Sequence, residues 1–190
     1  NLIKRNNETM SLVNKETNIE ILITAEQIAK RIETLADEIV ADAPSDLLIV
    51  VILKGSFVFA ADLVRELERK GASAQVDFVS LSSYDVGKVS RGSVKVTHDL
   101  SEDVTGRAVL IVDDILESGR TLDFARKTMF QRKAASVKTC LLLDKPTQRK
   151  VDIEADYVGF TIDPQFVVGY GLDFAKRYRG LPYIGALGSN

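Results

Sequence analysis

Two runs of consecutive apolar residues constrain the fold of this chain more than any other feature. LLIVVIL covers residues 47–53 and AVLIV covers residues 108–112, and neither run alternates apolar with polar residues. Strands that are buried on both faces have this pattern, and they occur in parallel sheets covered by helices on each side. The runs therefore predict an α/β fold with a mostly parallel central sheet flanked by helices.

Other periodic segments extend this prediction. Thr24 and Gln27 have the spacing of a capping box, and the apolar residues behind them recur at helical intervals to about residue 41. The remaining predicted elements, in chain order, are a helix over 57–70, a strand over 74–82, a helix over 121–133 and strands over 136–143, 157–160 and 166–170. Residues 83–107 are polar and rich in small side chains, which predicts either a long loop or a mobile hairpin in which residues 94–96 pair.

Two polar motifs directly follow the buried runs. LKGS covers residues 53–56, and DDILESGRT covers residues 113–121. Ligands of open parallel sheets bind beyond the carboxyl ends of the strands. The predicted fold therefore places both motifs in one site.

The end of the second motif is suited to binding a phosphate. Gly119 permits a tight turn, and the backbone N–H groups of residues 118–121 lie at the positive end of the following helix. The hydroxyls of Ser118 and Thr121 add further donors. GxxxxGK[ST] and GxGxxG do not occur in the sequence, which disfavours a nucleoside triphosphate or a dinucleotide as the ligand.

The three carboxylates of this motif need a partner other than the phosphate. Asp113, Asp114 and Glu117 can hold sugar hydroxyls or a divalent cation, so a sugar phosphate would satisfy both halves of the motif. A single acid near a helix start often only caps the helix. Three acids and a glycine turn after a buried strand favour a ligand site instead.

Composition narrows the class of protein. The net charge is −2, which disfavours a nucleic-acid partner, and no apolar run reaches the roughly 18 residues of a membrane span, so no membrane partner is expected. The single cysteine, Cys140, cannot form an intramolecular disulfide, which favours a cytoplasmic location. We expect residues 1–18 to form a flexible tail, with Met10 at or near the natural start.

Four segments together resemble the hypoxanthine-guanine phosphoribosyltransferases of the type I phosphoribosyltransferase family. VLIVDDILESGRTL (109–122) resembles their phosphoribosyl pyrophosphate signature, and ILKGSFVFAADL (52–63) resembles their pyrophosphate-binding segment. SSYDVGKVSRGSVKV (82–96) is similar to their mobile catalytic loop, and residues 141–185 are similar to their purine-binding segment. The resemblance covers about residues 21–186.

This resemblance implies a fold and an activity. The fold would be a single phosphoribosyltransferase domain over residues 19–190, with a small hood lobe built from the chain ends. The activity would be purine salvage, in which the 5-phosphoribosyl group moves from phosphoribosyl pyrophosphate to N9 of hypoxanthine or guanine and pyrophosphate leaves. Mg²⁺ would be the cofactor, and the protein would be a homodimer or homotetramer.

The resemblance also implies roles around the pyrophosphate. Lys54 and Gly55 would meet the pyrophosphate, with a cis peptide bond before Lys54, and Arg179 would clamp it. Ser83 and Tyr84 would close over the reacting centre, because they lie on the segment similar to the mobile loop.

The carboxylates and the phosphate loop have implied roles as well. Asp113 and Asp114 would bind the ribose hydroxyls directly or through Mg²⁺, and Asp173 would hold a second Mg²⁺ largely through water. The residues expected to hold the 5′-phosphate are Glu117, Ser118, Gly119, Arg120 and Thr121. Glu117 would also act as general acid or base at purine N7, a position where the family usually has Asp.

Four residues are implied at the purine. Lys145 would donate to the 6-oxo group, Phe166 would stack on the base, and Ile115 would lie on the other face. The backbone of Val167 would read the edge near the 2-position. Lys145 disfavours adenine, whereas the choice among hypoxanthine, guanine and xanthine stays open. The alternative function is a regulator that senses phosphoribosyl pyrophosphate and binds nucleic acid on the same fold.

Overall fold

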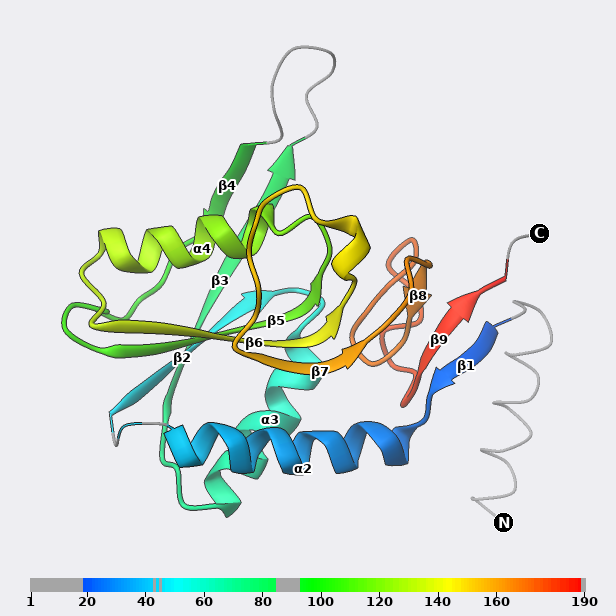
Figure 1. The fold of residues 1–190 in the computed structure, drawn as a ribbon, viewed down its shortest axis with the longest axis horizontal. Helices are drawn as coiled ribbons and strands as arrows, with labels where there is room; N and C mark the ends of the chain where they lie inside the picture. The colour runs from blue at the N-terminus through cyan, green and yellow to red at the C-terminus, as the bar shows by residue number, and fades with distance from the viewer. Residues whose placement is uncertain (1–18, 43, 45, 85–92, 189–190) are drawn as a thin grey trace.

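The computed structural model describes residues 19–42, 44, 46–84 and 93–188. The predicted tail over residues 1–18 and residues 85–92 of the predicted mobile loop lie outside the described residues. In chain order the described elements are β1 (Ile19–Ile23), α2 (Ala25–Asp42), β2 (Leu47–Leu53), α3 (Phe57–Arg69), β3 (Gln75–Tyr84), β4 (Ser93–His98), β5 (Ala108–Leu116), α4 (Arg120–Gln131), β6 (Ser136–Asp144), the 3-10 helix η1 (Pro146–Gln148), β7 (Tyr157–Thr161), β8 (Val167–Val168) and β9 (Ile184–Leu187) (Figure 1).

The central sheet confirms the predicted fold class. Among the described residues it has the strand order β4-β3-β2-β5-β6-β7, and every pairing is parallel except that of β3 with β4. Helices α2 and α3 cover one face of this sheet, and α4 covers the other (Figure 1). The predicted α/β arrangement is therefore correct.

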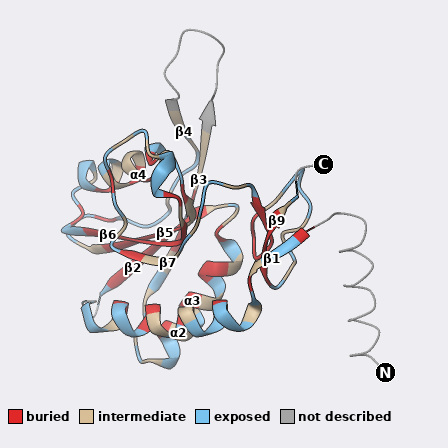
Figure 2. Cartoon of the chain, turned by 45° about the vertical axis from the view of Figure 1, so that its right-hand side comes forward, coloured by how far each residue is buried: buried red, intermediate tan, exposed pale blue. Residues whose placement is uncertain are grey.

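The apolar run of β2 is continuous because both of its faces are covered. Ile49 and Val51 pack with the core that contains α2 and α3, whereas Leu48 and Val50 pack with the core that contains α4. Successive side chains of a strand point to opposite faces, so each residue of the run enters one of the two cores. Figure 2 shows the resulting pattern, with buried strands inside and exposed outer helix faces.

A second, smaller sheet forms the hood lobe. Among the described residues its strand order is β1-β9-β8, and both pairings are antiparallel. β1 comes from the N-terminal part of the chain and β9 from the C-terminal part, and Figure 1 shows them side by side at the carboxyl ends of the central strands. The hood implied by the family resemblance is therefore present.

Several predicted boundaries are corrected by the structure. β5 continues to Leu116, so Asp113 and Asp114 belong to the strand rather than to the turn that follows it. The predicted strand over 166–170 is reduced to the two residues of β8, because Gly169 and Gly171 have positive φ angles and turn the chain away. The antiparallel pairing of β3 with β4 resolves the two alternatives for residues 83–107 in favour of a hairpin.

The start of α2 is the predicted capping box. The backbone N–H of Thr24 donates to Gln27 Oε1 at 2.8 Å, and the backbone N–H of Gln27 donates to Thr24 Oγ1 at 3.3 Å. These bonds satisfy amide groups that have no partner inside the helix. The helix then runs to Asp42, one residue beyond the predicted end.

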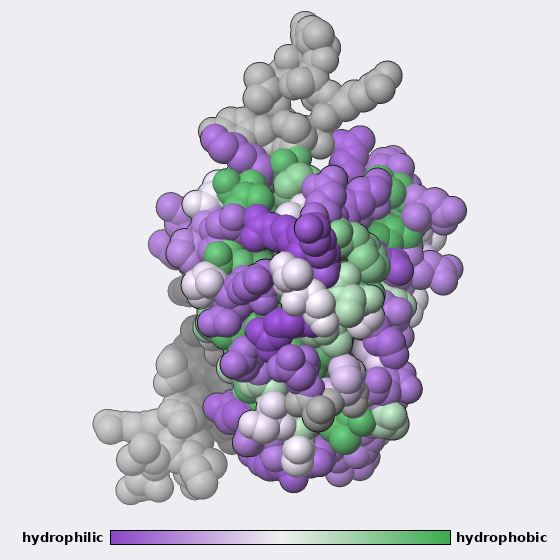
Figure 3. All heavy atoms as spheres, turned by 90° about the vertical axis from the view of Figure 1, so that its left-hand side faces the viewer, coloured by the Kyte–Doolittle hydropathy of each residue, from purple (hydrophilic) through white to green (hydrophobic). Residues whose placement is uncertain are grey.

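The surface at the amino ends of the strands lies on the opposite side of the molecule from the hood. It is mainly hydrophilic, with separate hydrophobic areas (Figure 3). No helix within the described ranges is both long and apolar enough to cross a membrane.

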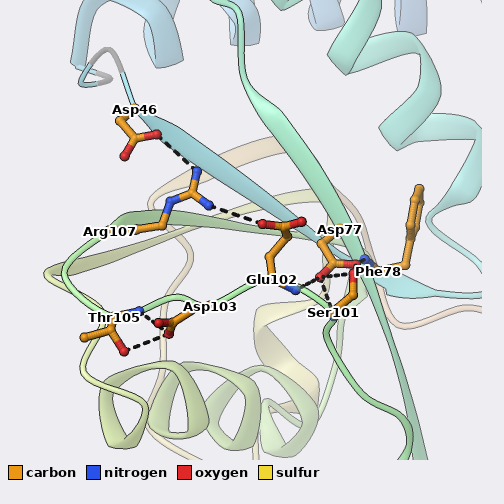
Figure 4. A network of polar contacts seen from close by, with 8 residues as sticks. All are labelled: Asp46, Asp77, Phe78, Ser101, Glu102, Asp103, Thr105 and Arg107. Carbon is orange, nitrogen blue, oxygen red and sulfur yellow. Dashed lines mark hydrogen bonds and ion pairs between the residues drawn. The ribbon is translucent and has the colours of Figure 1, made fainter.

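A buried carboxylate holds the connection between β4 and β5 against β3. Asp77 accepts backbone N–H groups from Phe78, Ser101 and Glu102, each at 2.8 Å (Figure 4). Burial by itself raises the pKa of Asp77, but the hydrogen bonds from these amides outweigh it and leave the pKa below its usual value of 3.8. The charged carboxylate therefore stabilises the folded state.

We predict that Asp77→Asn lowers the free energy of unfolding by about 2 kcal/mol at pH 7, because an amide NH₂ would face donors that now meet a carboxylate. The pKa of Asp77 is lower in the folded than in the unfolded state, so its contribution is complete well above pH 3.8 and is lost as the pH falls toward the folded pKa. Urea unfolding of both proteins at pH 7, 5 and 3 measures this. A difference that stays constant down to pH 3 would contradict the prediction.

Candidate active site

Two adjoining cavities open at the carboxyl ends of the central strands. The first has a volume of about 680 Å³ and the second about 410 Å³. The residues that line both are Leu53, Lys54, Gly55, Leu81, Asp114, Ile115 and Glu117. The two sequence motifs therefore share one site, as the fold prediction required.

The surroundings of Gly55 leave no room for a side chain at that position. A Cβ atom on Gly55 would lie 1.5 Å from Asp114 Oδ2, and a Cβ atom on Gly171 would lie 2.1 Å from the carbonyl oxygen of Gly55. The peptide bond between Leu53 and Lys54 is cis, as the resemblance implies. These contacts set the position of the LKGS segment against β5.

The two aspartates of β5 are held in a desolvated environment. Asp113 is buried, and its Oδ1 accepts the backbone N–H of Asp114 at 2.9 Å. Burial raises the pKa of Asp113 well above its usual value, and the neighbouring Asp114 charge raises it further. Burial also raises the pKa of Asp114, although hydrogen bonds to Asp113 and the backbone and the charge of Arg179 act in the opposite direction. Both carboxyls would gain from a hydroxyl donor or a cation.

The residues present fit a Mg²⁺ ion at the cavity edge. Oxygen ligands are the type that Mg²⁺ prefers, and a cation would compensate the desolvation of Asp113 and Asp114. Asp173 lines the same cavity as Asp114, but its Oδ1 is 2.6 Å from Nη2 of Arg179. Within the described ranges no three such side chains converge into a preformed metal cluster.

The start of α4 has the geometry of a phosphate cradle. Gly119 precedes the helix with a φ of +81° and has no side chain to cap it, whereas the backbone N–H of Arg120 donates to Ser118 Oγ at 3.4 Å. Ser118, Gly119, Arg120 and Thr121 all line the second cavity. The positive end of α4 thus faces this cavity, which suits an anion.

The residues implied in purine binding line the first cavity. Lys145 is buried, and its Nζ lies 2.5 Å from Oε1 of the half-exposed Glu117. Phe166 is an exposed aromatic ring, 54% accessible, with an edge-to-face contact to Phe174 at 5.6 Å between ring centres. An exposed ring at a cavity wall suits stacking against a flat ligand. Ile115 and Val167 line the same cavity, and Val167 pairs through its backbone with Ala186.

Arg179 is positioned between the hood and the acids. Its Nη1 donates to the carbonyl oxygen of Gly171 at 2.6 Å, and it also lines the first cavity. Ser83 and Tyr84 lie at the end of β3, where their backbones pair with Val94 and Ser93. The structure therefore places these two residues at the root of the hairpin.

Sequence reasoning missed some residues of the site. Ser82 and Thr97 line the first cavity from β3 and β4, and Ser82 Oγ is a buried atom without a hydrogen-bond partner among the described residues. Gly171 was missed as well, although the glycines of GYG (169–171) were a signal of a tight backbone turn.

This fold and site define an α/β protein whose cavities are suited to a sugar phosphate next to a flat aromatic base. The phosphate cradle, the buried acids and the cavity with Lys145 and Phe166 lie side by side along one sheet edge.

Comparisons with known proteins give the family. The family model described as the phosphoribosyl transferase domain matches residues 19–175, and this chain belongs to that family. The hypoxanthine phosphoribosyltransferase of Escherichia coli K12 is 45% identical over 170 residues, covering 88% of this chain and 94% of that protein. The hypoxanthine-guanine phosphoribosyltransferase of Bacillus subtilis is 44% identical over 169 residues, covering 88% and 92%. A crystal structure of a hypoxanthine phosphoribosyltransferase from Staphylococcus aureus is 40% identical, with a TM-score of 0.86, covering 93% and 95%.

We predict that Gly55→Ala weakens the binding of inorganic pyrophosphate with Mg²⁺ at least tenfold, because the added methyl group would displace Asp114 or the LKGS segment. Isothermal titration calorimetry measures the affinity. Gly180→Ala is the matched control, since a Cβ atom there meets no described atom within 4 Å. Equal affinities for the two variants would contradict the prediction.

Proposed function

We propose that this chain is a purine salvage enzyme that transfers the 5-phosphoribosyl group from phosphoribosyl pyrophosphate to N9 of hypoxanthine or guanine. The observation that supports this most directly is the contact of buried Lys145 with Glu117 in the cavity that Phe166 also lines. A cationic donor next to a carboxylate is complementary to the 6-oxo and N7 edge of a 6-oxopurine. The relatives named above are enzymes of this kind, and none of them supports the regulator alternative.

In the reaction, the bond between sugar C1 and the pyrophosphate oxygen breaks and a bond from C1 to purine N9 forms. The electron pair of the broken bond leaves with the pyrophosphate, and positive charge develops at C1. Asp113 and Asp114, reached through the ribose hydroxyls, would stabilise that charge more in the transition state than in the ground state. The burial of Asp113 strengthens this effect, because water screens its charge little.

The purine must lose a proton as N9 becomes bonded to the sugar. Glu117 is placed to accept or share that proton at N7, since its carboxylate lies at the junction of the two cavities. Lys54 and Arg179 would bind the departing pyrophosphate. Mg²⁺ bound by Asp113, Asp114 and Asp173 would supply further neutralisation of that leaving group.

Lys145 determines which class of purine is accepted. Its ammonium group is only a donor, so a 6-oxo group is a partner and the 6-amino group of adenine is not. Because Lys145 is buried, a base that leaves it without an acceptor would lose binding energy.

We also propose that the enzyme is a homodimer or homotetramer in the cytoplasm. Large exposed apolar residues outside the cavities, Ile21, Phe57, Phe78 and Phe130, support association between copies. The one cysteine, buried Cys140, suits a reducing compartment. Light scattering after size-exclusion chromatography measures the mass of the particle in solution, and a monomer would contradict the proposed homodimer or homotetramer.

The proposed function is tested by offering phosphoribosyl pyrophosphate and Mg²⁺ with hypoxanthine, guanine, xanthine or adenine separately and measuring nucleotide formation. We expect turnover with hypoxanthine or guanine and at least 100-fold lower kcat/KM with adenine, a difference of about 2.7 kcal/mol. A folded protein that binds phosphoribosyl pyrophosphate but turns over no base would contradict the proposal.

Glu117 gives a second prediction. Glu117→Gln should lower kcat by about 10²- to 10⁴-fold, because the amide cannot accept the purine proton. Glu117→Asp keeps the carboxylate, so it should retain kcat within about tenfold of the unchanged enzyme. Steady-state kinetics with hypoxanthine measures both variants. An equal loss of kcat in the two variants would contradict the prediction. It would show that the length of the side chain, rather than proton transfer, matters at this position.

A further inference from the structure

Arg149 lies outside both cavities, but its side chain binds the backbone of two residues that line the first cavity, Glu117 and Lys145. Nη1 of Arg149 donates to the carbonyl oxygens of Leu116 at 2.8 Å, Glu117 at 2.9 Å and Lys145 at 3.2 Å. Nε donates to the carbonyl oxygen of Ile153 at 3.1 Å, and Nη2 is paired with the Asp144 carboxylate. Neither cavity of the site is lined by Arg149.

The sheet ends at this point, and Arg149 adds a donor to each of these carbonyl groups, of which that of Lys145 also accepts the backbone N–H of Gln148 at 3.0 Å. The pairing of β5 with β6 stops at Leu116 and Asp144, and the last backbone bond runs from the N–H of Lys145 to the oxygen of Leu116 at 2.9 Å. Beyond it the two chains turn apart. The Arg149 side chain is 18% exposed, so water reaches these carbonyl groups little and the loss of Arg149 would remove one donor from each of them. The planar guanidinium reaches these carbonyls through Nη1 while Nε and Nη2 reach Ile153 and Asp144, a spread that the single nitrogen of an ammonium does not have.

The bonded carbonyls belong to the proposed base-recognition pair. Glu117 directly follows β5 and Lys145 directly follows β6, and their side chains meet at 2.5 Å. Arg149 holds the main chain of both residues through a single nitrogen, so the separation of the two side chains depends on it.

The same arginine also supports the phosphate loop. Ile153, whose carbonyl it binds, backs Gly119, because a Cβ atom on Gly119 would lie 2.6 Å from Cγ2 of Ile153. The backbone N–H groups of Lys150 and Val151 donate to the oxygen of Ser118 at 2.9 and 3.1 Å. The segment that Arg149 closes is therefore the wall behind the phosphate cradle.

We propose that Arg149 is a positioning residue. It fixes the positions of the Glu117–Lys145 pair and of the phosphate loop relative to each other. The inference rests on the proposed function for the roles of Glu117 and Lys145. Arg149 touches no substrate in this account and acts through the backbone alone. A displacement of about 1 Å at a reacting group can lower the rate by about 100-fold, so the effect of losing this arginine is measurable.

The experiment compares Arg149→Lys and Arg149→Met with matched changes at Arg31. Arg31 is a fair control because it also bridges backbone carbonyls and a carboxylate: Nη2 donates to Val158 at 2.7 Å, Nε donates to Gly159 at 3.1 Å, and Nη1 pairs with Glu38 at 2.6 Å. It lies on α2 and lines neither cavity. For each folded variant, kcat, the KM of hypoxanthine and of phosphoribosyl pyrophosphate, and the melting temperature are measured.

Positioning predicts a specific pattern. Both Arg149 variants should lose about 10- to 100-fold in kcat and bind hypoxanthine several-fold more weakly. Arg149→Lys should be no more active than Arg149→Met, because a positive charge without the planar guanidinium is insufficient. Arg149→Ala should regain part of its kcat in millimolar guanidinium but not in ammonium. The Arg31 variants should lower the melting temperature and leave kcat and both KM values within twofold.

The outcomes separate this inference from the proposed function. If the Arg149 variants keep kcat and both KM values and only melt earlier, the positioning role is overturned. If the unchanged protein has no turnover with any base, the proposed function fails instead. The affinity of the Arg149 variants for ribose 5-phosphate then tests the inference independently, since binding to the phosphate loop can be measured without turnover. Binding at least tenfold weaker than that of the unchanged protein supports the inference, and unchanged affinity overturns it.

Discussion

The parallel pairing of β2 with β5 is the interaction on which the site depends. It aligns Val51 with Val112, so the segment after each strand emerges at the same edge of the sheet. The contact of Gly55 with Asp114 follows directly from that register. A shift of one residue along either strand would exchange the two faces of the run and separate the groups that the reaction requires to be adjacent.

The charge distribution of the site follows from the same arrangement. The carboxyl groups of Asp113 and Asp114 lie at the end of β5. Burial raises the pKa of both groups, so a positive partner would stabilise their charged forms. Cationic groups arrive from other elements: Lys54 follows β2, and Arg179 comes from the segment before β9. The sheet thus separates the groups that would stabilise positive charge at the sugar from those that would receive the anionic leaving group.

How much could be predicted depended on how local each signal is. The buried run of β2 and the capping box at Thr24 and Gln27 each consist of residues that are close in the sequence. The α/β class and the start of α2 were therefore predicted correctly. The pairing of β1 with β9 was not predicted from periodicity, since those strands are short and come from opposite parts of the chain. Likewise the motif residues at the site were found from sequence, whereas Arg149 gave no signal, because its role arises only where two strands separate.

The hood lobe has a consequence for the order in which the site is assembled during synthesis. The acids of β5 and the phosphate loop, with the wall behind it, are complete once the chain has been made to about residue 153, but β8, with the backbone of Val167, is held by β9 further along the chain. A nascent chain that has not released β9 from the ribosome has a sugar-phosphate site without a fixed base pocket. Base recognition is therefore acquired after the phosphate site as the chain is synthesised.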